Sequence, residues 1–131
     1  MRPHFLLDAA DGRTPCGLRV ERTGAWLITN LRLAGDSAER RRGLLDAEGL
    51  QDGEGLVIAP SQGIHTFGMR FAIDVVGVTR DGRIVLIRPA VRPRRIVLSW
   101  RAFAMVELSA GAAARAAIRP GDRLVVTPLS A

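Results

Sequence analysis

The sequence has no lysine, no tyrosine and only one cysteine, Cys16. A single thiol excludes an internal disulfide and any metal site built from several thiolates. Histidine is nearly as scarce: only His4 and His65 are present, whereas histidine-based metal sites on β scaffolds need two or three such ligands together. We therefore expect neither a metal ion nor another cofactor.

Long apolar runs are also missing. No stretch is long enough to cross a bilayer, and the apolar run at residues 5–7 is too short for a signal peptide. These absences predict a chain without a membrane span, and we expect it in the cytoplasm.

The remaining composition is that of an ordered globular chain. Its 131 residues are 47% hydrophobic, enough for one domain with a core of its own. Seven prolines and fourteen glycines are spread along the chain, which favours many short strands and turns over a helical bundle.

The apolar pattern predicts where the elements lie. Residues 1–15 are polar and punctuated by glycine and proline, so we expect a loose arm ahead of one β-rich domain at 16–131. Short apolar or alternating stretches predict strands, with a hairpin turn at 81–82; the stretches are 18–33, 55–59, 73–79, 83–88, 99–108 and 124–127. Two short helices are expected, at 40–45 behind a capping box and at 111–117. The sequence thus predicts a mainly β fold, a single-domain β-sandwich or a partly open barrel with two short helices.

The charge balance favours acidic partners. Nineteen arginines stand against thirteen acidic residues, a formal net charge of +6, although along most of the chain the two signs interleave as on a solvated surface. The one basic concentration is the stretch 88–95, where Arg94 and Arg95 are candidate ligands for a phosphate or carboxylate because guanidinium binds both bidentately. Trp100 is the nearest aromatic residue, which disfavours a nucleic-acid stacking platform. We expect a small anionic ligand or an acidic protein partner instead of nucleic acid.

The stretch 63–76 holds the most informative polar residues, His65 and Asp74. Asp74 shares a strand face with apolar residues, and a buried carboxylate must be paired. Its candidate partners are His65, Arg70 and the backbone N–H groups of the turn at Gly68. Two interpretations are open: an acid that ties the turn to the sheet, or a carboxylate positioned in a pocket.

Glu107 raises the same question on a later strand. An ion pair with an arginine is its expected role. If it lay beside Asp74 on a neighbouring strand, the two acids and His65 could perform acid–base chemistry. The nucleophile candidates lack a recognisable partner base; they are Cys16, Ser61, Thr66 and Ser99.

Several segments together resemble one family. They are residues 42–45, 55–58, 64–75, 81–82, 106–108 with Gly111, and 121–122. In combination, over about 18–126, they are similar to the bacterial and archaeal "domain of unknown function 192" family. The resemblance implies a mainly β single domain and supplies no activity. Many relatives have tryptophan where His65 stands and proline where Ala72 stands, which argues against His65 as a general catalytic base of the family.

Taken together, the residues predict a small binding or accessory module more than an enzyme. Its polar site would be formed by His65, Arg70, Asp74 and Glu107, with anion affinity added by Arg94 and Arg95. One alternative is a hydrolase or lyase that uses His65 with Asp74 or Glu107 as an acid–base pair. Another is an arginine-mediated binder of phosphate or nucleic acid.

Overall fold

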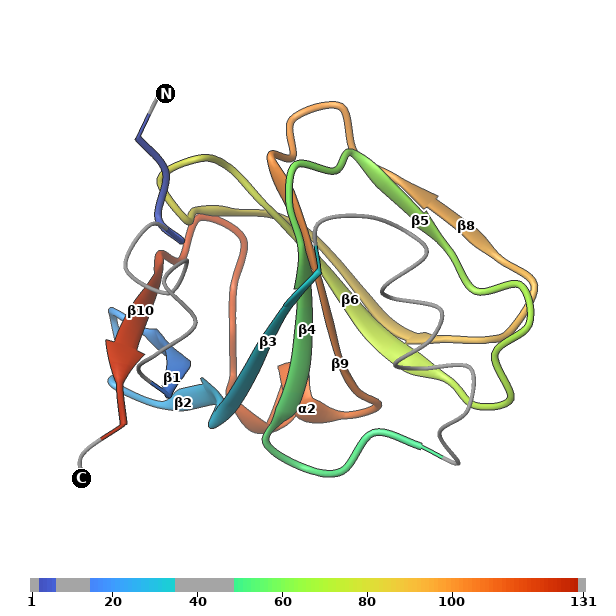
Figure 1. The fold of residues 1–131 in the computed structure, drawn as a ribbon, viewed down its shortest axis with the longest axis horizontal. Helices are drawn as coiled ribbons and strands as arrows, with labels where there is room; N and C mark the ends of the chain where they lie inside the picture. Colours follow the sequence, from blue (N-terminus) through green and yellow to red (C-terminus); the bar gives the residue numbers. More distant parts are fainter. Residues whose placement is uncertain (1–2, 7–14, 35–48, 130–131) are drawn as a thin grey trace.

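The computed structural model describes residues 3–6, 15–34 and 49–129, and it is mainly β (Figure 1). The described strands are β1 (Cys16–Val20), β2 (Trp26–Ile28), β3 (Asn30–Ala34), β4 (Glu54–Ile58), β5 (Gly63–His65), β6 (Ile73–Val78), β7 (Ile84–Val91), β8 (Ile96–Leu98), β9 (Ala104–Ser109) and β10 (Leu124–Pro128). The described helix is α2 (Ala112–Arg115). The mainly β prediction is confirmed, with separate packed sheets and no closed barrel among these residues.

A five-stranded sheet in the order β3-β4-β9-β6-β7 forms the centre of the molecule (Figure 1). Strands β3 and β4 run parallel, and the other neighbours are antiparallel. The predicted hairpin joins β6 to β7, and Gly82 takes the left-handed conformation with φ of 88°. A side chain there would collide with the carbonyl oxygen of Leu124, because the ideal Cβ position lies 2.5 Å from that atom. Glycine is therefore required at this turn.

Smaller sheets cover both faces of the central sheet. A first core packs Val76, Val106 and Leu108 of the central sheet against the three-stranded sheet β10-β1-β2. A second core packs Val75 and Met105 against the two-stranded ribbon of β5 and β8. Every residue of β6 and β9 is buried, because alternate side chains enter different cores.

The two expected helices and the expected N-terminal arm at 1–15 compare less fully with the structure. Helix α2 lies within the predicted range 111–117 but is shorter, and Gly111 precedes it with φ of 92°. The other expected helix, at 40–45, lies outside the described residues. In the predicted arm, the Phe5 N–H donates to the Arg80 carbonyl at 2.8 Å, and Leu6 is buried in the first core. The division into an arm at 1–15 and a domain at 16–131 stays a prediction. No described helix has the length and apolar character needed to cross a membrane.

Candidate functional site

The β5–β8 ribbon and the segment just after it carry the most exposed large apolar side chains of the described chain. Its antiparallel register pairs Ile64 with Val97, and both side chains are buried in the second core. Residues directly opposite each other in such a ladder share a face, so His65 and Ile96 share the other face with Gly63 and Leu98. On that face the exposed fractions are 65% for Ile96 and 61% for Leu98. The ribbon therefore buries one side and presents an apolar side to solvent.

A cleft of about 320 Å³ follows the ribbon. It is lined by Ile58, Ser61, Gly63, Ile64, His65, Ile96 and Leu98. An ideal Cβ on Gly63 would lie 2.6 Å from Leu98 Cδ2, so only glycine lets the leucine lie across β5 at this point. The hydroxyl of Ser61 donates to the Gly63 carbonyl at 2.7 Å, which fixes the entry to β5.

Trp100 extends the apolar surface beyond β8. Its side chain is 80% exposed, the largest value among the large hydrophobic side chains of the described residues. The Gln62 amide donates to the Trp100 carbonyl at 2.8 Å, so the backbone that carries this side chain is held to the segment ahead of β5. Phe67, half exposed, lies on the other end of the ribbon with its ring centroid 5.7 Å from that of His65.

Thr66 holds the arginine-rich loop, and sequence reasoning missed this role. Its side chain is fully buried, and its hydroxyl donates to the Arg92 carbonyl at 2.7 Å while accepting the Arg95 N–H at 2.9 Å. The Thr66 N–H also donates to the Arg95 carbonyl at 2.9 Å. Thr66 thus acts as a structural tie and not as the nucleophile considered from the sequence. A hydroxyl residue just past a strand is typical of such local side chain–backbone bonds, and that was the available signal.

The exposed charges on the described stretches that flank the ribbon in the sequence are all positive. From residue 82 to residue 106, and from 55 to 73, the sequence contains no acidic residue. The arginines at 92, 94, 95 and 101 are exposed, as is Arg70 between β5 and β6. The described ion pairs use other arginines and lie elsewhere, at Asp52, Asp81, Asp122 and Glu21. Of the predicted ligand-binding residues, His65 lies on β5, and Arg94 and Arg95 lie in the loop that leads into β8.

Asp74 belongs to a different place, and its predicted partners were wrong. Its carboxylate is fully buried on the first-core face of β6, where it accepts three backbone N–H groups. They come from Ala90 at 2.8 Å, Gly111 at 3.1 Å and Ala113 at 2.9 Å. Ala90 sits in a bulge of β7 with φ of 49°, and the other two donors lie at the start of α2. The acid therefore ties a bulge and a helix start to the sheet, instead of meeting His65, Arg70 or the Gly68 turn.

Glu107 lies on the opposite face of the same sheet. In the β6–β9 register it stands opposite Val75, whereas Asp74 stands opposite Leu108. Because neighbouring positions along a strand point to opposite faces, Glu107 faces the second core and Asp74 the first. The predicted carboxylate pair of Asp74 and Glu107 is therefore wrong, since a sheet separates the two side chains.

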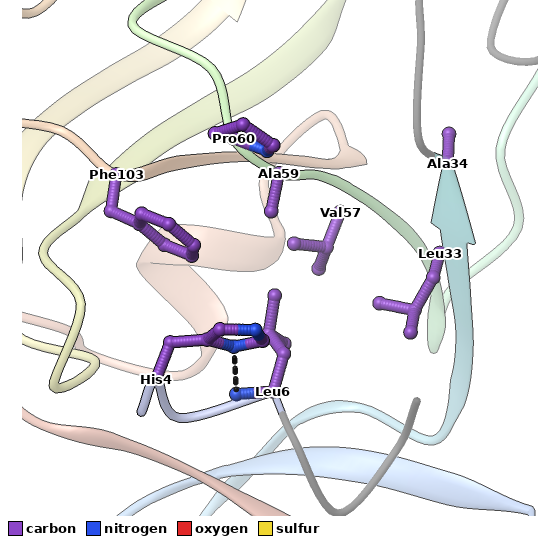
Figure 2. A pocket seen from close by; sticks show the side chains of 8 residues that line it. All are labelled: His4, Leu6, Leu33, Ala34, Val57, Ala59, Pro60 and Phe103. Carbon is purple, nitrogen blue, oxygen red and sulfur yellow. Dashed lines mark hydrogen bonds between the residues drawn. The ribbon is translucent and has the colours of Figure 1, made fainter. Parts of the chain in front are cut away.

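Two of the other hollows have different linings. The apolar pocket in Figure 2 has a volume of about 270 Å³, and in it His4 Nδ1 accepts the Leu6 N–H at 3.2 Å. Another hollow, of about 370 Å³, is bordered by Trp26 and by the ion pair of Asp52 with Arg115. Within the described residues, no group of three or more His, Cys, Asp or Glu side chains is placed to hold a metal ion.

The chain is thus a small mainly β protein with packed sheets and an exposed two-stranded ribbon, β5–β8. The chain belongs to the domain of unknown function 192 (DUF192) family, described as "Uncharacterized ACR", whose model matches residues 18–126. This match confirms the resemblance noted from the sequence segments.

Solved structures of similar fold include proteins from two bacteria. A Novosphingobium aromaticivorans protein of unknown function is 25% identical with a TM-score of 0.70, over 84% of this chain and 82% of its own. A Sinorhizobium meliloti protein, named as a candidate transcription regulator, is 23% identical with a TM-score of 0.72, over 85% of this chain and 91% of its own. No curated protein matches the sequence. These similarities support the mainly β fold, and they do not indicate an activity for this chain.

Proposed function

We propose that this protein is a binding module that takes an acidic protein partner on the exposed face of the β5–β8 ribbon. The observation that carries the proposal is the exposure of Ile96 and Leu98 on the outer face of β8, with the exposed Trp100 two residues beyond. A contiguous apolar patch on a soluble protein is typical of an interaction surface, because leaving it in water costs about 25 cal/mol per Å².

The arginines beside this patch favour a partner with negative charge. Arg94 and Arg95 precede β8 directly, and the N–H groups of both donate to Thr66, so little loop ordering is needed on binding. The stretches 55–73 and 82–106, which contain both strands of the ribbon, supply no acidic residue of their own to these guanidinium groups. An apolar centre with a cationic border fits a partner whose apolar side chains are flanked by carboxylates.

The acid–base alternative has less support. The Asp74 carboxylate is already occupied by three backbone donors and lies on the other side of the sheet from Glu107. His65 lies on the ribbon beside Ile96, where it fits contact with a ligand.

The experiment compares probes of different chemistry against matched variants. Fluorescence anisotropy would measure binding of fluorescein-labelled peptides rich in aspartate and valine, of the same peptides with lysine for aspartate, and of single-stranded and double-stranded DNA. Sedimentation with phosphatidylserine and phosphatidylcholine vesicles would measure membrane binding. We expect binding of the acidic peptides alone, with loss in Leu98→Ser and in Arg94→Glu. Arg119→Glu, the same charge change at an exposed arginine between α2 and β10, is the matched control and should bind normally.

Other results would replace the proposal. Binding of DNA that falls steeply with salt would make the arginines a phosphate site, a result relevant to the Sinorhizobium meliloti relative's name. Binding of phosphatidylserine vesicles alone would make the patch a membrane contact. Equal binding by Leu98→Ser and the unaltered chain would show that the ribbon is not the site.

A further inference from the structure

We infer that the open edge of β8 takes up an extended segment of the partner as an additional β-strand. The inference rests on the proposed function, because it states how the acidic partner is held at the same ribbon. It concerns the backbone of Ile96 and Leu98, whereas the proposed function concerns their side chains and the neighbouring arginines.

The hydrogen-bond pattern of the ribbon shows which backbone groups face outward. Thr66 N–H donates to the Arg95 carbonyl at 2.9 Å, and Ser99 N–H donates to the Gln62 carbonyl at 2.8 Å. In an antiparallel ladder, hydrogen-bonded pairs alternate with pairs that are not hydrogen-bonded. The register places His65 with Ile96, and Gly63 with Leu98, at the second kind of pair. The N–H and C=O groups of Ile96 and Leu98 therefore point away from β5, toward the other edge of β8.

That edge is open in the part of the chain that the structure describes. β8 pairs with β5 alone, and Figure 1 shows it as the outermost strand on the right of the molecule. Proteins usually protect an edge with a charged or proline residue within the strand, a bulge or a covering segment. β8 is short, with three residues, but it reads Ile-Val-Leu, with Pro93 three residues ahead of it and no register shift against β5. An exposed edge of this kind is the feature that strand addition requires, and the partner's strand can extend past both ends of β8.

The flanking residues specify the chemistry of the added strand. Its side chains on the outer face would pack beside Ile96 and Leu98, where β-branched or aromatic residues give the best cross-strand contact. The end of the strand beside Arg94 and Arg95 would carry aspartate or glutamate, because guanidinium groups bind carboxylates bidentately. The occupant is thus an extended acidic segment with alternating apolar residues.

A second copy of the chain is a poorer occupant for the same edge. Pairing β8 with the β8 of another molecule would bring together two ribbons that have exposed arginines and no acid in the adjoining stretches. Such like charges repel across an interface, whereas a separate acidic strand would neutralise them.

The test starts from an unbiased selection on the full chain. Random octapeptides displayed on phage would be selected against the immobilised protein, and the selected peptides would be synthesised for anisotropy measurements. We expect alternating apolar residues with carboxylates at one end. Amide hydrogen exchange on the unaltered chain would then show slowed exchange at Ile96 and Leu98 when the selected peptide is added, because their N–H groups become hydrogen-bonded.

A pair of variants separates backbone from side chain. Ile96→Pro removes the outward N–H and keeps the pairing with β5, since Ile96 is not hydrogen-bonded to that strand; proline is tolerated at such edge positions. Ile96→Thr is the matched control, because it shortens the side chain and keeps the N–H. We expect Ile96→Pro to bind the selected peptide about tenfold more weakly than Ile96→Thr. If the proline variant does not fold, the exchange measurement on the unaltered chain still decides the matter.

The outcomes distinguish this inference from the proposed function. If Arg94→Glu abolishes binding while exchange at Ile96 and Leu98 is unchanged by peptide, the partner binds the surface without adding a strand, and the inference alone fails. If the selected peptides carry no acid and Arg94→Glu binds them normally, both fail. A dimer in light scattering that Ile96→Pro dissociates would make a second copy the occupant and overturn the peptide inference.

Discussion

Asp74 is the residue whose replacement tests the structural reasoning most directly. In Asp74→Asn the side chain keeps its size, but one oxygen becomes an –NH2 group that can only donate. If the amide oxygen stays with the donors at Gly111 and Ala113, the –NH2 group meets the Ala90 N–H, which the native carboxylate accepts at 2.8 Å. One hydrogen bond is then replaced by two donors facing each other inside the protein.

The expected cost follows from these bonds. Loss of the charge-assisted bond to Ala90 costs about 1.5–3 kcal/mol, and the two remaining bonds weaken as they become neutral. We expect the free energy of unfolding to fall by about 3 kcal/mol in total. With a urea m-value of about 2 kcal/mol/M for a chain of this size, the unfolding midpoint falls by about 1.5 M.

Urea unfolding followed by tryptophan fluorescence measures this change. Asp52→Asn is the matched control: the Asp52 side chain is 79% exposed and pairs with Arg115 at the surface, so the change should cost less than about 0.5 kcal/mol. The acidic peptides should bind Asp74→Asn normally under conditions where it is folded, because the residue does not line the ribbon cleft. Equal midpoints for the two variants would refute the reasoning that Asp74 ties β6 to β7 and α2.

Three other predictions concern the ribbon and the effect of pH. Thr66→Val should lower stability by about 1–3 kcal/mol and speed amide exchange at Arg95, since it removes the hydroxyl that binds the loop, while Thr66→Ser should behave like the unaltered chain. Gly63→Ala should displace Leu98 and weaken peptide binding with intact folding by circular dichroism, and unchanged affinity would contradict this role of the glycine. The hydrogen bond with Arg22 lowers the pKa of Asp122 in the folded chain, so this acid should stabilise the fold above about pH 4, with the contribution lost as pH falls through the lowered value. Urea unfolding from pH 7 to pH 2 should show a smaller acid loss in Asp122→Asn, and an equal loss would refute this.

The local pattern of apolar and turn residues in the sequence predicted much of the secondary structure. Alternation and turn residues act over a few positions, so they predicted the β6–β7 hairpin around Gly82 and a strand that includes β9. The same pattern raised the burial of Asp74 as one possibility, since its strand neighbours on the same face are apolar, but it left the role of the acid open. The sequence did not predict that the β5–β8 ribbon is exposed on one side, because the residues of β8 are as apolar as those of a core strand.

The partners of the polar residues depended on long-range packing. In the pairing of β6 with β9, Glu107 stands opposite Val75, one position from Asp74, so the two side chains point to opposite faces of the sheet. No local pattern in the sequence specifies that register. The donors to Asp74 come from residues 16, 37 and 39 positions away, where a bulge and a helix start happen to turn their N–H groups inward. The residue types along the chain therefore established strands, turns and an excess of positive charge, because these depend on neighbouring positions. Assembly of distant strands determined that Thr66 lies inside and Ile96 outside, because burial depends on what packs above each face.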